Sequence, residues 1–264
     1  MTPFKAISDL EYSCPGGIPL LLDLYLPLHA RRPAAAVLWV PGGGWGHCDR
    51  KTAPLVLLEH GFVMASLMYR TTSQAVAPAN IHDCKAAVRW LRANAAQHGI
   101  DPHRIGAWGS SAGGHLVALL GTTDGMPDLE GNGENAGQSS AVQAVCDFCG
   151  PTDLAQMAAP DIQERHPHLE GILEAYLGGP VTRYQKLARL VSPLSHVSAR
   201  CAPMLIVHGE ADGTVPVGES RMFYKALQAA GADAVLHVLP EVGHGWDARL
   251  TDDLVVSFFK TKLA

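Results

Sequence analysis

The sequence predicts an α/β fold in which a mostly parallel central sheet is flanked by helices on both faces. With 264 residues, 47% of them hydrophobic and 17% charged, the chain can bury a large core. Short apolar runs bounded by Pro and Gly alternate with amphipathic stretches along most of its length. Because alternating strands and helices build parallel sheets covered on both sides, we expect one domain spanning residues 1–264.

The expected strands are short apolar or alternating runs that end at turn residues. They cover 20–26, 35–40, 62–69, 103–108, 142–148, 203–208 and 234–239. Helical spacing of apolar residues places helices between these strands, the clearest beginning at Asn80 as a possible N-cap and stopping at Gly99. The other helices are expected at 53–60, 112–120 and 216–230 and at the C-terminus.

Two stretches depart from this alternation. Residues 122–140 are rich in Gly, Asn and Asp, and residues 155–190 insert a helical pattern with several Pro and Gly between neighbouring strands. Loops that cover a substrate often arise as such insertions between core elements. Both segments are therefore candidates for a lid or cap.

The five residues from Gly109 to Gly113 read Gly-Ser-Ser-Ala-Gly and lie between a predicted strand and a predicted helix. A tight strand-to-helix turn that exposes a nucleophile needs nearly side-chain-free residues two before and two after it. This spacing makes Ser111 a candidate nucleophile, although the pattern alone also fits a plain Gly/Ser-rich turn. The context favours the nucleophile.

A serine hydroxyl needs a neutral imidazole to accept its proton and an acid to orient that imidazole. Asp212 follows the apolar run 203–208, and His244 follows the last predicted strand between two glycines. The carboxyl ends of parallel strands are where sites gather in open α/β sheets. Ser111, Asp212 and His244 are therefore expected to form a catalytic triad.

Other acids remain open as the third member of the triad. Glu210 is the alternative on the same loop as Asp212, whereas Asp153 and Asp247 do not follow the strand before the last one. Asp212 itself could be a turn residue or a helix cap, and any one of 13 histidines could be a surface or core residue. The joint order and spacing favour Asp212 and His244.

The run Pro41-Gly-Gly-Gly-Trp45 follows the strand at 35–40. Consecutive glycines let backbone N–H groups turn toward a developing oxyanion. We expect Gly43 and Gly44 to donate to it, together with the Ala112 N–H at the start of the helix after the elbow. The alternative is a flexible glycine turn.

Charge and cysteine content exclude several other classes. A formal net charge of −5 and the lack of a Lys/Arg stripe argue against nucleic acid as a partner. No apolar run approaches the ~20 residues that span a bilayer, and the first ten residues are mixed. We therefore expect no membrane contact and a cytoplasmic location, with a secreted form whose leader has been removed left open.

Six cysteines are too few for a disulfide scaffold and are expected as reduced thiols. Cys146 and Cys149 form a Cys-x-x-Cys pair, but no second pair completes a zinc site. We expect core or pocket-edge cysteines here, and neither a metal nor a cofactor.

Several motifs resemble the α/β-hydrolase superfamily, and more closely its bacterial feruloyl-esterase and carbohydrate-acetylesterase-like branch. The likeness spans most of the chain in five segments, at 41–45, 83–101, 106–115, 149–154 and 204–246. Ser110 stands where hormone-sensitive-lipase-like relatives usually carry Asp, which argues against that group. The family's glycine loop usually begins with His, where this chain has Pro41. The resemblance places Trp45 and Trp246 near the mouth of a substrate pocket, although both could be core residues.

These observations predict a serine carboxylesterase that hydrolyses short-chain acyl or aryl esters, of acetyl or feruloyl type, through an acyl-enzyme. An arylformamidase-like amide hydrolase would use the same residues. A non-catalytic ligand-binding protein of the same fold is the third alternative. The expected partner is a small-molecule ester, and a homodimer is left open.

Overall fold

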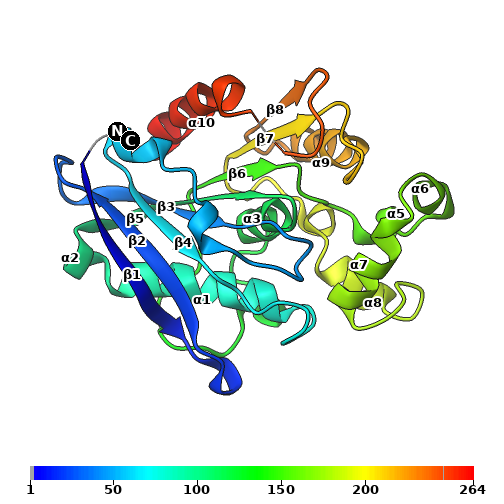
Figure 1. The fold of residues 1–264 in the computed structure, drawn as a ribbon, viewed down its shortest axis with the longest axis horizontal. Helices are drawn as coiled ribbons and strands as arrows, with labels where there is room; N and C mark the ends of the chain where they lie inside the picture. Colours follow the sequence, from blue (N-terminus) through cyan, green and yellow to red (C-terminus); the bar gives the residue numbers. More distant parts are fainter. Residues whose placement is uncertain (1–2, 246) are drawn as a thin grey trace.

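A single mixed sheet organises the part of the chain that the structure describes, residues 3–245 and 247–264 of a computed structural model (Figure 1). Its eight strands follow the order β1-β2-β4-β3-β5-β6-β7-β8. The strands from β4 to β8 in that order run parallel, whereas β2 pairs antiparallel with both β1 and β4. Their bounds are β1 Phe4–Ser13, β2 Leu20–Pro27, β3 Ala34–Val40, β4 Val63–Leu67, β5 Ile100–Ser110, β6 Ala144–Phe148, β7 Met204–Gly209 and β8 Ala234–Leu239.

Helices cover both faces of the sheet, and the predicted α/β class is confirmed. The longer ones are α1 (Ala79–Ala93), α3 (Ala112–Thr122), α7 (His168–Leu177), α9 (Gly218–Ala229) and α10 (Ala248–Lys262). The shorter helices and 3-10 turns are α2 Ala95–His98, α4 Pro127–Glu130, α5 Leu154–Met157, α6 Pro160–Arg165, α8 Gln185–Leu190, η1 Pro15–Gly17, η2 Arg50–Thr52, η3 Val56–His60 and η4 Pro193–His196. No helix among the described residues is long and apolar enough to cross a membrane.

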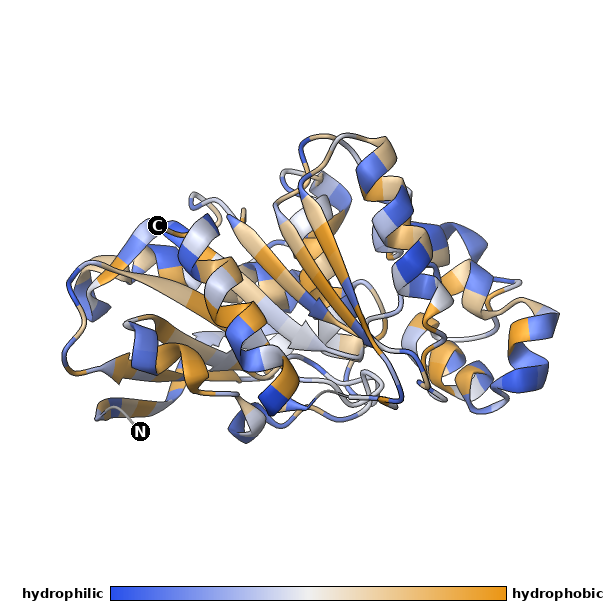
Figure 2. Cartoon of the chain, turned by 90° about the horizontal axis from the view of Figure 1, so that it is seen from above, coloured by the Kyte–Doolittle hydropathy of each residue, from blue (hydrophilic) through white to orange (hydrophobic). Residues whose placement is uncertain are grey.

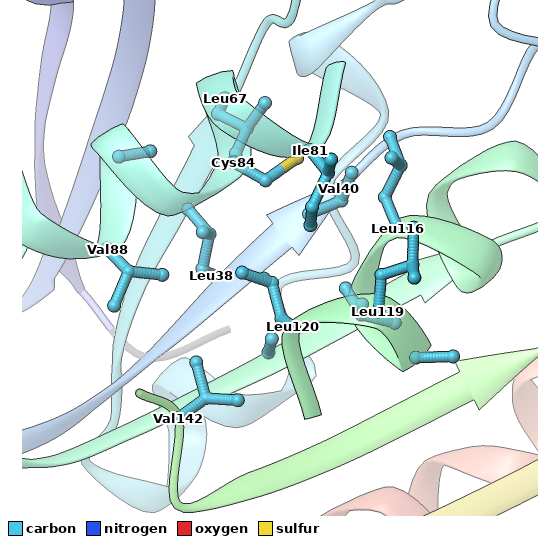
Figure 3. Packing of buried hydrophobic residues seen from close by; sticks show 14 of the residues in the cluster. Leu38, Val40, Leu67, Ile81, Cys84, Val88, Leu116, Leu119, Leu120 and Val142 are labelled. Carbon is cyan, nitrogen blue, oxygen red and sulfur yellow. The ribbon is translucent and has the colours of Figure 1, made fainter. Parts of the chain in front are cut away.

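Strand β3 shows why both faces must be covered. All seven of its residues are buried, and successive side chains point to opposite faces. Leu38 and Val40 pack with residues of α1 and α3 (Figure 3), whereas Val37 and Trp39 belong to a second cluster with α10. Colouring by hydropathy accordingly shows apolar strands inside and helices with one polar side (Figure 2).

Three local expectations were wrong. The polar edge strand β1 was not predicted, because its burial pattern is mostly exposed and lacks an apolar alternation. Within the segment expected as a helix at 53–60, the structure has only the 3-10 turn η3 at Val56–His60. Asn80 lies inside α1, which begins one residue earlier, and its amide donates to the Arg70 carbonyl oxygen at 2.5 Å rather than capping the helix.

The two insertions take different positions. Glu130 ties the segment 122–140 to α1, because it pairs with Lys85 at 2.6 Å and with Arg89 at 3.0 Å. The segment 155–190 forms most of α5 and then α6 to α8, a group of helices beside the sheet (Figure 1). Only this second insertion contributes described residues to the cavity that contains Ser111.

The turn between β5 and α3 depends on two glycines. A Cβ added to Gly113 would lie 1.9 Å from the Val40 carbonyl oxygen, and one added to Gly109 would lie 2.4 Å from the Gly113 carbonyl oxygen. Both contacts are with backbone, so no side-chain rotation could relieve them. The start of α3 can therefore approach β3 and β5 this closely only with glycine at these positions.

Replacing Gly113 with Ala should destabilise the protein severely. We expect a loss of at least about 3 kcal/mol in the free energy of unfolding, because the new methyl group can be accommodated only if α3 moves. Urea unfolding at equilibrium measures it. The control is Gly218→Ala at the start of α9, where a Cβ meets nothing within 4 Å. Equal stabilities of the two variants would contradict the steric account.

Candidate active site

The structure brings the three predicted triad residues together at the carboxyl ends of the parallel strands. The Ser111 Oγ lies 2.9 Å from His244 Nε2, and the His244 Nδ1 lies 2.8 Å from Asp212 Oδ2. Asp212 follows β7 and His244 follows β8. This geometry allows the serine hydroxyl to donate to Nε2 while Nδ1–H donates to the carboxylate.

Ser111 occupies a strained turn between β5 and α3. Its φ of 55° and ψ of −123° lie in a region that L-residues seldom adopt. The Ser111 N–H donates to the Phe148 carbonyl oxygen at 2.7 Å, which fixes the turn against the end of β6. The side chain therefore stands at the N-terminus of α3, where the helix dipole favours negative charge.

Asp212 is held by donors on both carboxylate oxygens. Oδ1 accepts from the Thr214 and Val215 N–H groups at 2.8 and 2.9 Å. Oδ2 lies 2.8 Å from His244 Nδ1 and 3.1 Å from His208 Nε2. Burial raises the pKa of Asp212, but hydrogen bonds from the two histidines and the backbone outweigh it and hold that pKa well below its usual range. The carboxylate is therefore ionised at neutral pH.

The alternative acids point elsewhere. Glu210 is half-exposed and pairs with Arg221 at 2.9 Å. Asp153 caps α5, and Asp247 caps α10 and pairs with Arg249. None of these three carboxylates is bonded to His244.

The His244 loop approaches the end of β7 closely. A Cβ on Gly209 would lie 2.3 Å from both the Val242 and the Gly243 carbonyl oxygens. The Ala211 N–H also donates to the Val242 carbonyl oxygen at 2.9 Å. These contacts bring the loop that carries His244 onto the loop that carries Asp212.

The glycine loop after β3 faces the same cavity. Gly43 and Gly44 have φ angles of +122° and +56°, and a Cβ on Gly43 would lie 2.4 Å from the His47 carbonyl oxygen. Within the described part of the chain, the N–H groups of Gly43, Gly44 and Ala112 donate to no protein acceptor. All three residues line the cavity that contains Ser111. They are thus available to a bound oxygen atom.

Neighbouring side chains brace this loop even though it begins with Pro41. The Tyr69 hydroxyl donates to the Pro41 carbonyl oxygen at 3.1 Å. The Trp45 indole N–H donates to His115 Nδ1 at 3.2 Å, and the indole stacks on Tyr176 with ring centroids 4.2 Å apart. These contacts support the loop where the usual histidine is absent, and no motif in the sequence predicts them.

Trp45 combines the two positions that the sequence left open. It lines the cavity, but its side chain is only 2% exposed and belongs to the buried core. Packing on Tyr176 and His115 explains why it lies inside. The other tryptophan, Trp246, lies outside the described residues.

The cavity over Ser111 has a volume of about 370 Å³ and a mostly apolar lining. Met157 comes from α5, and Leu169 and Ile172 come from α7. The sequence predicted the insertion at 155–190 as a candidate lid or cap, but not these three residues. Which side chains face the site depends on how the helices pack. Its described lining residues are Gly42, Gly43, Gly44, Trp45, Ser110, Ser111, Ala112, Cys149, Pro151, Met157, Leu169, Ile172, Thr214, Val215, His244 and Gly245.

The Cys-x-x-Cys cysteines are both buried thiols. Burial raises the pKa of Cys149 to about 12, so its thiol is protonated and unreactive at neutral pH. Its sulfur, one Asp212 carboxylate oxygen and one His244 ring nitrogen lie within 4.8 Å of one another. Two of these three groups, the Asp212 carboxylate and the His244 ring, already bond to each other.

A family model described as BD-FAE matches residues 22–227. The chain belongs to the BD-FAE family. This finding confirms the resemblance to the feruloyl-esterase-like branch of the α/β-hydrolases.

Proteins and structures similar to this BD-FAE member include named esterases. Esterase LipQ of Mycobacterium tuberculosis is 35% identical over 254 residues, which cover 92% of this chain and 58% of that protein. Esterase LipC of the same organism is 32% identical over 221 residues, covering 82% of this chain and 54% of that protein. The chain thus spans somewhat more than half the length of these curated relatives.

Two solved structures resemble the chain over nearly its whole length. A truncated carbohydrate esterase from gut microbiota has a TM-score of 0.87 at 31% identity, covering 98% of this chain and 96% of that one. A thermophilic esterase from Thermogutta terrifontis, solved with butyrate bound, has a TM-score of 0.74 at 28% identity, covering 97% and 94%. The α/β-hydrolase fold expected from the motifs is confirmed.

His115 should make stability depend on pH. Burial lowers its pKa from the ordinary 6.5 to about 4, so the folded protein keeps it neutral where the unfolded chain protonates it. Stability is therefore lost as pH falls from 6.5 toward 4. We expect His115→Gln to flatten this loss by up to about 1.4 kcal/mol per pH unit. Urea unfolding of both proteins across this range measures it, and parallel curves would contradict the assignment.

Proposed function

We propose that the chain is a serine carboxylesterase in which Ser111 is the nucleophile, His244 the general base and Asp212 the residue that orients the imidazole. The observation that carries this proposal is the Ser111–His244–Asp212 arrangement, with spacings of 2.9 and 2.8 Å, at the floor of an apolar cavity. Membership of the BD-FAE family and the named esterase relatives support the reaction class.

The geometry suits a two-step reaction through an acyl-enzyme. His244 Nε2 takes the proton of Ser111 as Oγ bonds to the ester carbonyl carbon, and the carbonyl oxygen becomes an oxyanion. The Gly43, Gly44 and Ala112 N–H groups are free to donate to that oxygen. The C–O bond to the alcohol then breaks, and His244 delivers its proton to the leaving oxygen. Water activated by the same imidazole hydrolyses the acyl-enzyme and restores Ser111.

The cavity lining favours short-chain acyl or aryl groups of acetyl or feruloyl type. Met157, Leu169 and Ile172 offer only apolar contacts, and 370 Å³ is at the small end of ligand pockets. The butyrate bound to the Thermogutta terrifontis esterase is a short acyl product of the same kind. The carbohydrate esterase from gut microbiota supports an esterified sugar as one substrate type.

Replacing Ser111 with Ala should abolish turnover without unfolding the protein. We expect kcat/KM to fall by at least about 10³-fold on p-nitrophenyl acetate and butyrate, because the substitution removes the hydroxyl that hydrogen-bonds to His244 Nε2. Initial rates, with circular dichroism as a check on folding, measure it.

The substrate panel should also contain p-nitrophenyl octanoate, methyl ferulate and N-formylkynurenine. Ser257→Ala, on the exposed side of α10, is the control and should keep parental rates. Turnover of N-formylkynurenine alone would favour an arylformamidase. If the parent turned over no substrate, a non-catalytic binder would be favoured.

Ile172 should limit acyl length. Its Cγ2 lies 3.6 Å from where a Cβ on Gly44 would stand, so the side chain closes the cavity beside the glycine loop. We expect Ile172→Ala to raise the octanoate-to-butyrate ratio of kcat/KM by about tenfold, because it opens room for extra methylenes. Ile162→Ala, in the same insertion but outside the cavity lining, is the matched control. An unchanged ratio would place the acyl chain elsewhere.

A further inference from the structure

A second histidine contacts the carboxylate of Asp212. His208 lies at the end of β7, four residues before Asp212, and is fully buried. Its Nε2 lies 3.1 Å from Asp212 Oδ2, the same oxygen that bonds to His244. The same Nε2 lies 3.0 Å from the Val215 carbonyl oxygen, and Nδ1 lies 2.7 Å from the Ser220 Oγ.

These contacts fix the tautomer of His208. Both neighbours of Nε2, a carboxylate and a carbonyl, can only accept hydrogen bonds, so Nε2 must carry the proton. Ser220 can donate its hydroxyl proton to Nδ1. The Nε2–H group thus donates to the Val215 carbonyl oxygen and lies 3.1 Å from Asp212 Oδ2, and Ser220 holds the ring in that state.

The backbone of Val215 bonds to both Asp212 and His208. Its N–H donates to Asp212 Oδ1 at 2.9 Å, whereas its carbonyl oxygen faces His208 at 3.0 Å. Val215 also lines the cavity over Ser111. The imidazole of His208 therefore sets the position of both the acid and this part of the cavity wall.

We propose that His208 is a positioning residue for the triad. Its imidazole holds Asp212 in place and partly satisfies the hydrogen-bonding capacity of Oδ2, the oxygen that Asp212 presents to His244. This inference rests on the proposed function. By sharing Oδ2, His208 weakens the attraction between Asp212 and the proton on His244. His244 then releases that proton to the leaving alcohol more readily.

Other ionisable groups surround this network. Asp212 faces His208 on its own strand-end, His244 from the loop after β8 and Cys149 from the loop after β6. Asp147 of β6 interacts electrostatically with His208 from within the core. His244 is the other side chain that contacts Asp212 Oδ2, so removing the His208 imidazole leaves His244 as the single side-chain donor to that oxygen among the described residues.

Substitution of His208 tests the role through a pH profile. In His208→Leu, the backbone N–H groups of Thr214 and Val215 still hold Asp212, but Oδ2 no longer contacts a second imidazole. The proton on His244 is therefore bound more tightly. We expect kcat to fall about tenfold with KM unchanged, and the acid limb of the pH–kcat/KM profile to move up by about half a pH unit or more. His208→Gln keeps an N–H donor and should recover most of the parental kcat and bring the acid limb most of the way back to its parental pH.

The matched control is His98→Leu, which removes a buried histidine that stacks on Trp90, on the opposite end of β5 from Ser111. Its acid limb should coincide with that of the parent. A folded His208→Leu variant whose acid limb stays in place or moves to lower pH would overturn the proposal, whatever its loss of stability.

A measurement on the unaltered protein covers the case in which His208→Leu does not fold. Long-range ¹H–¹⁵N correlation spectra distinguish the two neutral tautomers of each histidine. The proposal requires the Nε2–H form for His208 and the Nδ1–H form for His244, and an Nδ1–H form for His208 would overturn it. The spectra do not depend on turnover, so an inactive parent would refute the proposed function while still testing His208.

Discussion

The close approach of α3 to the ends of β3 and β5 is the constraint on which the rest of the site depends. A side chain at Gly113 would collide with the Val40 carbonyl oxygen, so the helix can start here only because the residue has no Cβ. This approach forces Ser111 into a conformation with φ 55° and turns its side chain out of the sheet. It also sets the Ala112 N–H beside the glycine loop that leaves β3. A steric requirement between two backbones thereby aligns the proposed nucleophile with its proposed oxyanion donors.

Electrostatic requirements complete the arrangement at neighbouring strand ends. Asp212 is buried, and burial of a carboxylate is tolerated only where donors satisfy it. Two backbone N–H groups and two histidines do so, and they leave the carboxylate ionised and fixed in orientation. On the other side of the cavity, the glycine loop is held by the Trp45–His115 hydrogen bond and by Tyr69. Buried polar contacts thus brace both halves of the site.

The sequence could predict what local patterns encode. The parallel strands, the elbow glycines and the order of Ser111, Asp212 and His244 follow from short-range spacing and chain order. It could not predict β1, since an exposed edge strand has no apolar alternation to reveal it. Nor could it decide between a pocket-mouth and a core position for Trp45, or predict the role proposed for His208, because both depend on contacts between segments far apart in the chain or on the course of a loop. The apolar residues of α5 and α7 likewise gained meaning only once their helices were packed beside Ser111.

A crystal structure after reaction with a p-nitrophenyl alkylphosphonate would test the catalytic assignment most directly. We expect a covalent bond from Ser111 Oγ to phosphorus, with the phosphoryl oxygen within about 3 Å of the Gly43, Gly44 and Ala112 nitrogens. The alkyl group should lie against Met157, Leu169 and Ile172. Attachment to any other residue, or a phosphoryl oxygen turned away from these three N–H groups, would contradict it.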